Sequence, residues 1–364
     1  MRQEYIDRLV NMMETDAVLI APGEELMFFT GFSPMHCERF QGLVVKKDGT
    51  AFYVCNILYE GEMTKGLAGA CPIYCWHDNE GMDKVYEILR AQGIHDCSLA
   101  VNSTAFAFNT IDVGRALNLE LVNGKPLMEE VRIKKSHEEL EIMRASAAIA
   151  DSVYEPVCNF IRPGITEADI RDFMLDIMAK QGGYEFDCIV ASGPNSSYPH
   201  YSSYGRTIEE GDCIVLDWGC HYKEMMSDTS RTVFVGSATE EQKAVYELVN
   251  RAQLASQAEV KEGAWIPDID KKAREVLDEQ GLAWTLINRV GHGIGYSVHE
   301  GPYINQINNR RLERGMCFSI EPGVYLAGNY GIRVENICCV NEKGEAEAFN
   351  KTDRSLRIID WYKK

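Results

Sequence analysis

Long apolar runs are missing from this 364-residue sequence, and their absence limits where the protein can reside. Within residues 1–30 no apolar run is longer than about six residues before a charged or polar side chain or a proline ends it. A secretory signal needs a longer uninterrupted apolar segment, and a membrane span needs about twenty apolar residues. We therefore expect no export signal, no membrane partner and a cytoplasmic location.

Positive charge is also scarce. Lysine and arginine total 37 against 55 aspartate and glutamate residues, which gives a net charge of −18. Such a field repels phosphate backbones and anionic membrane surfaces, so we expect no nucleic-acid partner. Hydrophobic residues make up 45% and charged residues 25% of the chain, a balance that excludes disorder, collagen and coiled coil.

Cysteine, by contrast, is plentiful, with twelve residues. In a chain without an export signal these thiols are expected to be reduced. Cys71, Cys75 and His77 imitate part of a zinc site, but no fourth ligand follows at a suitable spacing. We therefore interpret these cysteines as small buried side chains.

The length predicts two or three domains. The first 125 residues alternate between strand-like and helical patterns, including a hairpin signal in GLVVKKDGTAFYV with Asp48-Gly49 at its turn. Charge replaces apolar periodicity in the stretch 122–136. We place a smaller α/β domain at residues 1–128 and a larger one at residues 129–364.

The larger domain contains an internal repeat. The segments that begin at Ile161 and Val260 align without a gap at a constant offset of 99, so that Gly164 matches Gly263. Each segment includes an amphipathic helix, and strand-like runs follow it. Unless the similarity of two amphipathic helices is accidental, this pattern predicts an α+β domain with pseudo-twofold symmetry, whose site lies between the halves.

Acidic residues and one histidine stand in or beside the strand-like runs of both halves. A buried ionised carboxylate is costly unless it is paired or bound to a metal. Each residue alone could be a turn residue or an ion-pair partner, but an oxygen-rich set with one imidazole suits Mn²⁺, Fe²⁺, Co²⁺ or Zn²⁺. Four carboxylates can neutralise two such ions. The residues are Asp217, Asp228, His292, Glu321 and Glu335.

These residues and their settings, GHGIG, IEPG and RVEN, resemble the five metal ligands of the pita-bread metallopeptidases. That group includes methionine aminopeptidase, aminopeptidase P, prolidase and the metal-free relative creatinase. SGPNSSYPH, which ends at His200, and VHE, which contains His299, resemble the two active-site histidine motifs of its proline-specific branch. FFTGF at residues 28–32 resembles the creatinase-type amino-terminal domain.

The resemblance implies a pita-bread catalytic domain, a homodimer and a centre of two divalent ions, with Mn²⁺ the first expectation. Asp228 and Glu335 would bridge the ions, Asp217 would bind one of them, and His292 with Glu321 would bind the other. A hydroxide bridging the metals would then cleave the bond between an N-terminal residue and proline. Peptides with proline at the second position would be the substrates.

The remaining catalytic roles follow from the same resemblance. Glu321 would relay a proton to the leaving nitrogen, and His200 and His299 would hydrogen-bond the substrate or tetrahedral intermediate. Spacing adds one more residue: Arg333 lies two residues before Glu335, so on a strand both side chains would share a face, and Arg333 could orient that carboxylate or form a plain ion pair. Tyr201, Tyr204 and Trp218 could line a proline pocket or belong to the core.

One position departs from the prolidase pattern. Prolidases often carry an arginine four residues after the second histidine, where it binds the terminal carboxylate of a dipeptide, but here that residue is Tyr303. A phenol cannot pair with a carboxylate through two hydrogen bonds. Unless Arg206, Arg310 or Arg311 replaces the missing cation, longer Xaa-Pro peptides are favoured as substrates.

Two other functions are compatible with this type of sequence. A creatinase-like amidinohydrolase would use the same scaffold without metal, and a non-catalytic binding protein would need no active site. The five intact ligands argue against both alternatives.

Overall fold

The charged stretch around residue 130 is where the fold divides. A computed structural model describes residues 1–363, and the chain forms two compact units, Met1–Arg132 and Ile133–Lys364. The boundary expected after residue 128 lies inside the last helix of the first unit, α6 (Lys125–Arg132). Each unit has a hydrophobic core of its own.

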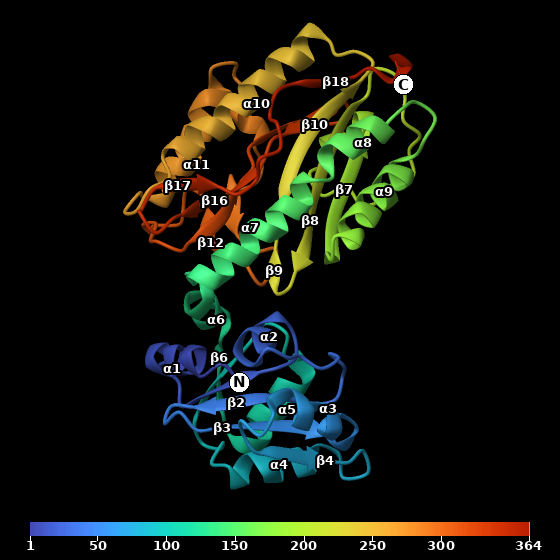
Figure 1. The fold of residues 1–364 in the computed structure, drawn as a ribbon. Helices are drawn as coiled ribbons and strands as arrows, with labels where there is room; N and C mark the ends of the chain where they lie inside the picture. Colours follow the sequence, from blue (N-terminus) through green and yellow to red (C-terminus); the bar gives the residue numbers. More distant parts are fainter. Residues whose placement is uncertain (364) are drawn as a thin grey trace. The chain divides into compact units, whose positions relative to one another are not determined.

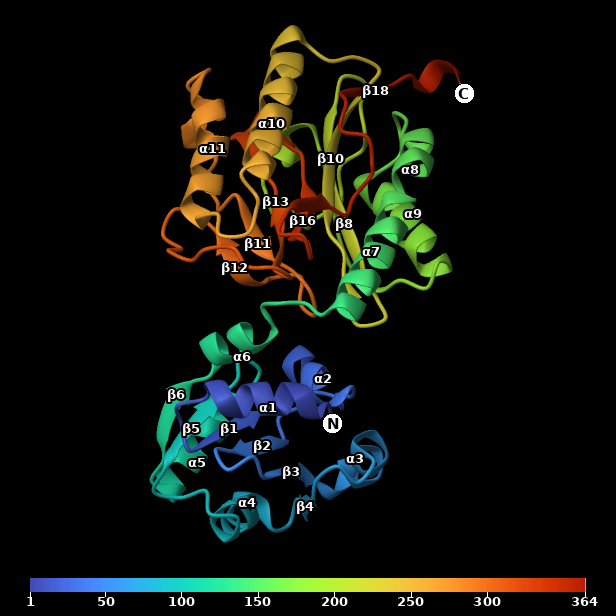
Figure 2. The ribbon, with the colours of Figure 1, turned by 60° about the vertical axis from the view of Figure 1, so that its left-hand side comes forward.

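The first unit is built on a six-stranded mixed sheet with the strand order β4-β3-β2-β1-β5-β6 (Figure 2). β2 and β3 form the antiparallel hairpin that the sequence predicts, and Gly49 in its turn has a φ of +84°. The strands are β1 (Ala17–Ile20), β2 (Gly42–Lys46), β3 (Ala51–Asn56), β4 (Ile73–Trp76), β5 (Ser98–Val101) and β6 (Glu120–Asn123). Before α6 come the helices α1 (Gln3–Met12), α2 (Glu24–Thr30), α3 (Glu60–Leu67), α4 (Gly81–Ala91) and α5 (Ala107–Leu117).

The second unit begins with three helices that pack against a sheet ordered β18-β10-β8-β7, with β9 paired to β8 (Figure 1). Helix α7 opens with the expected capping box of Ser136 and Glu139. The helices are α7 (His137–Asp151), α8 (Tyr154–Phe160) and α9 (Glu167–Lys180). The strands are β7 (Tyr184–Ser192), β8 (Cys213–Tyr222), β9 (Met225–Met226), β10 (Thr229–Val235) and β18 (Arg357–Ile359).

Two further helices cover the other half of this unit, over a sheet ordered β12-β11-β13-β16-β17 and a separate hairpin of β14 and β15. The capping box of Thr239 and Gln242 is present at the first of them. The helices are α10 (Glu240–Ala258) and α11 (Ile266–Asp278). The strands are β11 (Gly291–Gly293), β12 (Glu300–Ile304), β13 (Cys317–Ile320), β14 (Gly323–Leu326), β15 (Tyr330–Arg333), β16 (Asn336–Val340) and β17 (Ala346–Ala348).

Equivalent backbone contacts recur in the two halves of the second unit. Gly164 and Gly263 both have a positive φ, at +94° and +78°, which a glycine adopts without strain. The amide of Gly164 donates to the carbonyl of Ile208, as that of Gly263 donates to the carbonyl of Leu312. The acceptors are 104 positions apart, and this is also the separation of Asp217 and Glu321. Both residues therefore occupy related places in the two halves.

Within residues 1–363, no helix combines the length and the apolar character needed to cross a membrane.

Candidate metal centre

A cleft of about 640 Å³ in the second unit brings together most of the residues singled out in the sequence. Trp218 is excluded from it, because its side chain is fully buried in the core and its indole N–H donates to the carbonyl of Ala150 at 2.8 Å. Tyr201 and Tyr204 do line the cleft. The other predicted site residues in its wall are His200, Asp217, Asp228, His292, His299, Glu321 and Arg333.

Strand ends from both halves position the acidic side chains. Asp217 lies on β8 and Asp228 directly precedes β10, the strand paired with β8. Glu321 directly follows β13, and Glu335 lies between β15 and β16. His292 is the central residue of β11, which pairs with β13. Pairing of neighbouring strands thus gathers residues that are far apart in the sequence.

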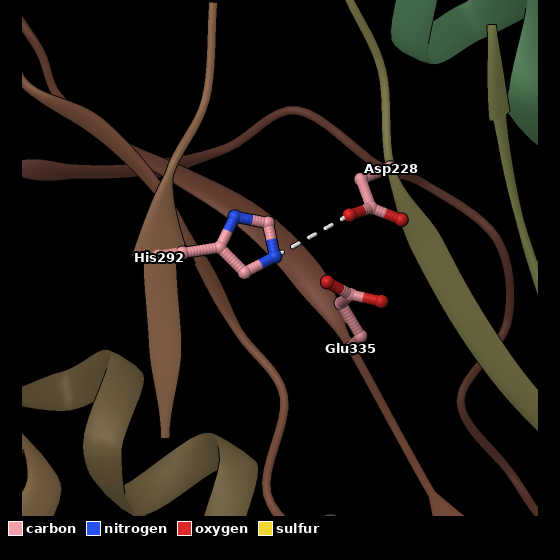
Figure 3. Close-up of side chains that lie close together, drawn as sticks. All are labelled: Asp228, His292 and Glu335. Atoms are coloured by element: carbon pink, nitrogen blue, oxygen red, sulfur yellow. Dashed lines mark ion pairs between the residues drawn. The ribbon is translucent and has the colours of Figure 1, made fainter. Parts of the chain in front are cut away.

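Asp228, His292 and Glu335 form the tightest group, shown in Figure 3. Each offers one ligand atom, these atoms lie within 4.8 Å of one another, and all three residues are buried. Nε2 of His292 is 3.6 Å from Oδ2 of Asp228 and 3.2 Å from Oε1 of Glu321. Asp217 and Glu321 line the same cleft outside this tight group.

The charges of the two buried carboxylates are poorly compensated by the protein. Burial, followed by the repulsion of neighbouring carboxylates, raises the pKa of both Asp228 and Glu335 well above the ordinary values. Among residues 1–363, Oε1 of Glu335 is buried without a hydrogen-bond partner. A divalent cation would relieve the repulsion and fill the open acceptor position, so the donor set fits a metal.

The hydrogen bonds of His292 direct one ring nitrogen toward this set. Nδ1 lies 3.1 Å from the carbonyl oxygen of Gly293, an acceptor that fixes the proton on Nδ1. Nε2 faces the carboxylates, and with a metal bound its lone pair would coordinate the ion. Burial alone would raise the pKa of Glu321, but its hydrogen bond with His292 brings that pKa below the ordinary value.

The guanidinium of Arg333 reaches two predicted ligands, but not from a strand that it shares with Glu335. Strand β15 ends at Arg333, so Arg333 and Glu335 do not share a strand. Its guanidinium pairs with Asp217, and its Nε donates to Oγ of Ser230 at 2.9 Å. The Ser230 hydroxyl in turn donates to Oε2 of Glu335 at 2.6 Å. Arg333 therefore touches one predicted ligand directly and a second through Ser230.

The two predicted histidines differ in environment. The ring of His299 meets the ring of His292 edge to face at 4.3 Å between centroids. Burial, followed by the charges of His292 and Arg289, lowers the pKa of His299 to about 4. Its imidazole is therefore neutral near pH 7. His200 is exposed at the wall of the cleft.

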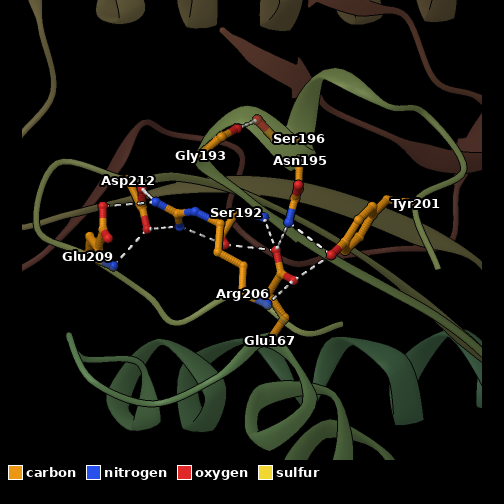
Figure 4. A network of polar contacts seen from close by, with 9 residues as sticks. All are labelled: Glu167, Ser192, Gly193, Asn195, Ser196, Tyr201, Arg206, Glu209 and Asp212. Carbon is orange, nitrogen blue, oxygen red and sulfur yellow. Dashed lines mark hydrogen bonds and ion pairs between the residues drawn. The ribbon is translucent and has the colours of Figure 1, made fainter. Parts of the chain in front are cut away.

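A buried carboxylate holds the loop that carries His200 (Figure 4). Glu167, at the start of α9, accepts hydrogen bonds from the backbone amide and the hydroxyl of Ser192, both at 2.8 Å. It also accepts from the Asn195 amide at 3.0 Å and from the Tyr201 hydroxyl at 2.9 Å. The amide of Arg206 adds a fifth donor at 3.1 Å. Glu167 thereby fixes both ends of the segment 192–206.

Comparisons with known proteins agree with this geometry. Residues 141–342 match metallopeptidase family M24, and residues 2–134 match the creatinase/prolidase N-terminal domain. The chain is 31% identical to the Xaa-Pro dipeptidase of Lactobacillus helveticus, over 97% of this chain and 98% of that protein.

Solved structures show the same likeness. A dipeptidase from Pyrococcus horikoshii OT3 has a TM-score of 0.90 and 33% identity, covering 98% of this chain and 100% of that one. An X-Pro aminopeptidase from Thermotoga maritima MSB8 has a TM-score of 0.84 and 26% identity, covering 98% and 99%.

The chain belongs to metallopeptidase family M24. Membership makes the protein an enzyme and confirms the predicted fold, a creatinase-type amino-terminal domain followed by a catalytic α+β domain. It also implies divalent metal ions, which the donor set described above fits.

Two side chains of this M24 metallopeptidase escaped the sequence analysis. Glu167 looks like an ordinary first-turn acid behind its N-cap, Thr166, and nothing local shows that it is buried. Arg289 lines the cleft, and only its position three residues before His292 could have drawn attention to it.

Proposed function

We propose that this M24 enzyme hydrolyses the bond between an N-terminal residue and proline at a centre of two divalent ions. The observation that carries the proposal is the buried group of Asp228, His292 and Glu335, whose carboxylates lack compensating charge. The names of relatives, an Xaa-Pro dipeptidase and an X-Pro aminopeptidase, support proline at the second position of the substrate.

The residues of both halves would share the ions. We assign Asp228 and Glu335 as bridging ligands, Asp217 to one ion, and His292 with Glu321 to the other. When bound, such ions lower the pKa of a water molecule and polarise the scissile carbonyl group.

The side chains around the ligands would then handle protons and orient the substrate. Glu321 takes the proton of the attacking water and passes it to the leaving nitrogen. His200 and His299 hydrogen-bond the substrate carbonyl as charge develops on its oxygen. The rings of Tyr201 and Tyr204 supply an apolar wall against which a prolyl ring can pack.

The direct test is hydrolysis by the metal-stripped and the reloaded protein. After treatment with a chelator, we expect Ala-Pro and Ala-Pro-Ala to stay intact, and Mn²⁺ or Co²⁺ to restore cleavage at the Ala-Pro bond. Ala-Ala serves as the control substrate and should be cleaved much more slowly. Full activity without metal would favour an amidinohydrolase-like mechanism, and no cleavage with bound metal would favour a binding protein.

The choice of Mn²⁺, the homodimer and the cytoplasmic location stay predictions, each resting on the sequence and the family resemblance.

A further inference from the structure

Arg289 projects a positive charge into the cleft beside the predicted catalytic residues. It lies just before β11, is half-buried and lines the cleft together with His299, Glu321 and Asn305. Its guanidinium carbon is 4.9 Å from the centre of the Tyr303 ring. Tyr303 is the residue that replaces the arginine often found in prolidases. Arg289 therefore supplies a cation next to the position at which that arginine would stand.

No carboxylate of the described residues pairs with Arg289. The guanidinium lies against the ring of Tyr303, and its N–H groups meet no hydrogen-bond acceptor within residues 1–363. Arg333, which also lines the cleft, pairs with Asp217, and Arg206, which does not line it, pairs with Asp212. The charge of Arg289 acts on Glu321 in the same cleft without forming an ion pair, so the N–H groups of the guanidinium remain available to an anionic ligand group.

The three cations suggested by the sequence do not take this place. Arg206 donates two hydrogen bonds to Asp212 and a third to Glu209. Arg310 and Arg311 do not line the cleft, and Arg311 is exposed and donates to the carbonyl of Gly263.

We propose that Arg289 binds the terminal carboxylate of an Xaa-Pro dipeptide. The inference rests on the proposed function and names the substrate class within it. The cation–π contact with Tyr303 holds the guanidinium in place, and its N–H groups remain available for two parallel hydrogen bonds to a carboxylate. Tyr303 then positions the cation instead of replacing it, which reverses the preference for longer peptides expected from the sequence alone.

The test compares Ala-Pro with its C-terminal amide, which has the same scissile bond and no carboxylate. We expect the parent enzyme to have a higher kcat/KM for Ala-Pro. In Arg289→Ala that value should fall by about 10–100-fold, mainly through KM, because a charged hydrogen-bond pair is lost. The amide should be cleaved equally well by both proteins.

Two further variants separate binding from folding. Arg289→Lys keeps the charge without the planar fork and should show an intermediate loss. Arg311→Ala removes an exposed arginine outside the cleft and should behave as the parent does. Equal losses on both substrates in Arg289→Ala, or no loss on either, would overturn the proposal.

A binding measurement keeps this inference distinct from the proposed function. Calorimetric titration of the metal-free protein with Ala-Pro and with the amide requires no hydrolysis. A preference for the carboxylate that disappears in Arg289→Ala supports the assignment even if neither peptide is cleaved. Absence of any such preference in the parent would overturn it.

Discussion

At the scale of single residues, the centre depends on carboxylates that the fold buries without neutralising. Burial raises the pKa of both Asp228 and Glu335, and neighbouring carboxylates raise it further: Glu335 acts on Asp228, and Asp217 acts on Glu335. The protein holds this unfavourable arrangement through neighbours such as Ser230, which donates to Glu335 at 2.6 Å. A site of this kind gains stability when a cation enters.

The two histidines outside the ligand set can be tested separately from the metal. We expect His200→Ala and His299→Ala to keep their ions and to lose about 10²–10³ in kcat, since each removes a hydrogen bond to the developing oxyanion. Metal content and steady-state kinetics on Ala-Pro measure the two effects. The exposed His137, changed to alanine, is the matched control. If His200→Ala or His299→Ala turns over substrate as fast as the parent, that histidine has a packing role and no role in catalysis.

The sequence contains enough information to nominate the five ligands but not their partners. Motifs such as GHGIG and RVEN single out His292 and Glu335 directly. The pairing of Arg333 with Asp217 depends on where β15 ends, and spacing alone does not reveal that. Arg289 is equally hidden, because its proposed role depends on the ring of Tyr303 on the neighbouring strand β12.

At the scale of elements, the segment 192–206 is held in place by one buried side chain. Five donors converge on Glu167, and the segment includes the cleft residues His200 and Tyr201. A glutamine can accept only part of these hydrogen bonds, and each buried donor left without a partner costs about 1–3 kcal/mol.

We therefore expect Glu167→Gln to lower kcat/KM by about tenfold or more while the metal content stays that of the parent. Amide hydrogen exchange should rise within residues 192–206. Glu209→Gln is the control, because Glu209 belongs to the same network but is exposed. If exchange and activity are unchanged in Glu167→Gln, the network does not position the segment.

Capping boxes and turn glycines made several elements predictable. The boxes at Ser136 and Thr239 are local patterns, and both are present in the structure. The three-residue strand β11 and the four-residue strands β14 and β15 are too short to leave a periodic pattern, and pairing with a neighbouring strand defines them.

At the scale of the whole molecule, the proposed metal would stabilise only one of the two units. All proposed ligands belong to Ile133–Lys364, whereas Met1–Arg132 has its own sheet and core. Ligand binding stabilises only the unit whose folded state forms the site.

Differential scanning calorimetry can follow this linkage. A metal ion at a free concentration of 100 times its Kd raises the free energy of unfolding of the catalytic unit by about 2.7 kcal/mol. This corresponds to a rise in Tm of about 5–10 °C for a unit of this size. We expect the transition of the catalytic unit to shift and that of the amino-terminal unit to stay in place. Equal shifts of both transitions would show that the units unfold together.

The internal repeat was the part of the architecture most accessible from sequence. Its offset of 99 reappears in the positive φ of Gly164 and Gly263, and their amides make equivalent hydrogen bonds to acceptors that are 104 positions apart. The boundary between the units was harder to place, because charge marks the stretch 122–136 but not the residue at which α6 ends.

The most direct test of the account is a count of metal ions in the parent and in one ligand variant. Elemental analysis after reloading with Mn²⁺ should give two ions per chain in the parent, and Asp228→Ala should lose both because that residue is assigned to bridge them. Asp187→Asn is the matched control, since Asp187 lines the same cleft without being a proposed ligand, and it should keep both ions. Parent-like metal content and hydrolysis in Asp228→Ala would contradict the account.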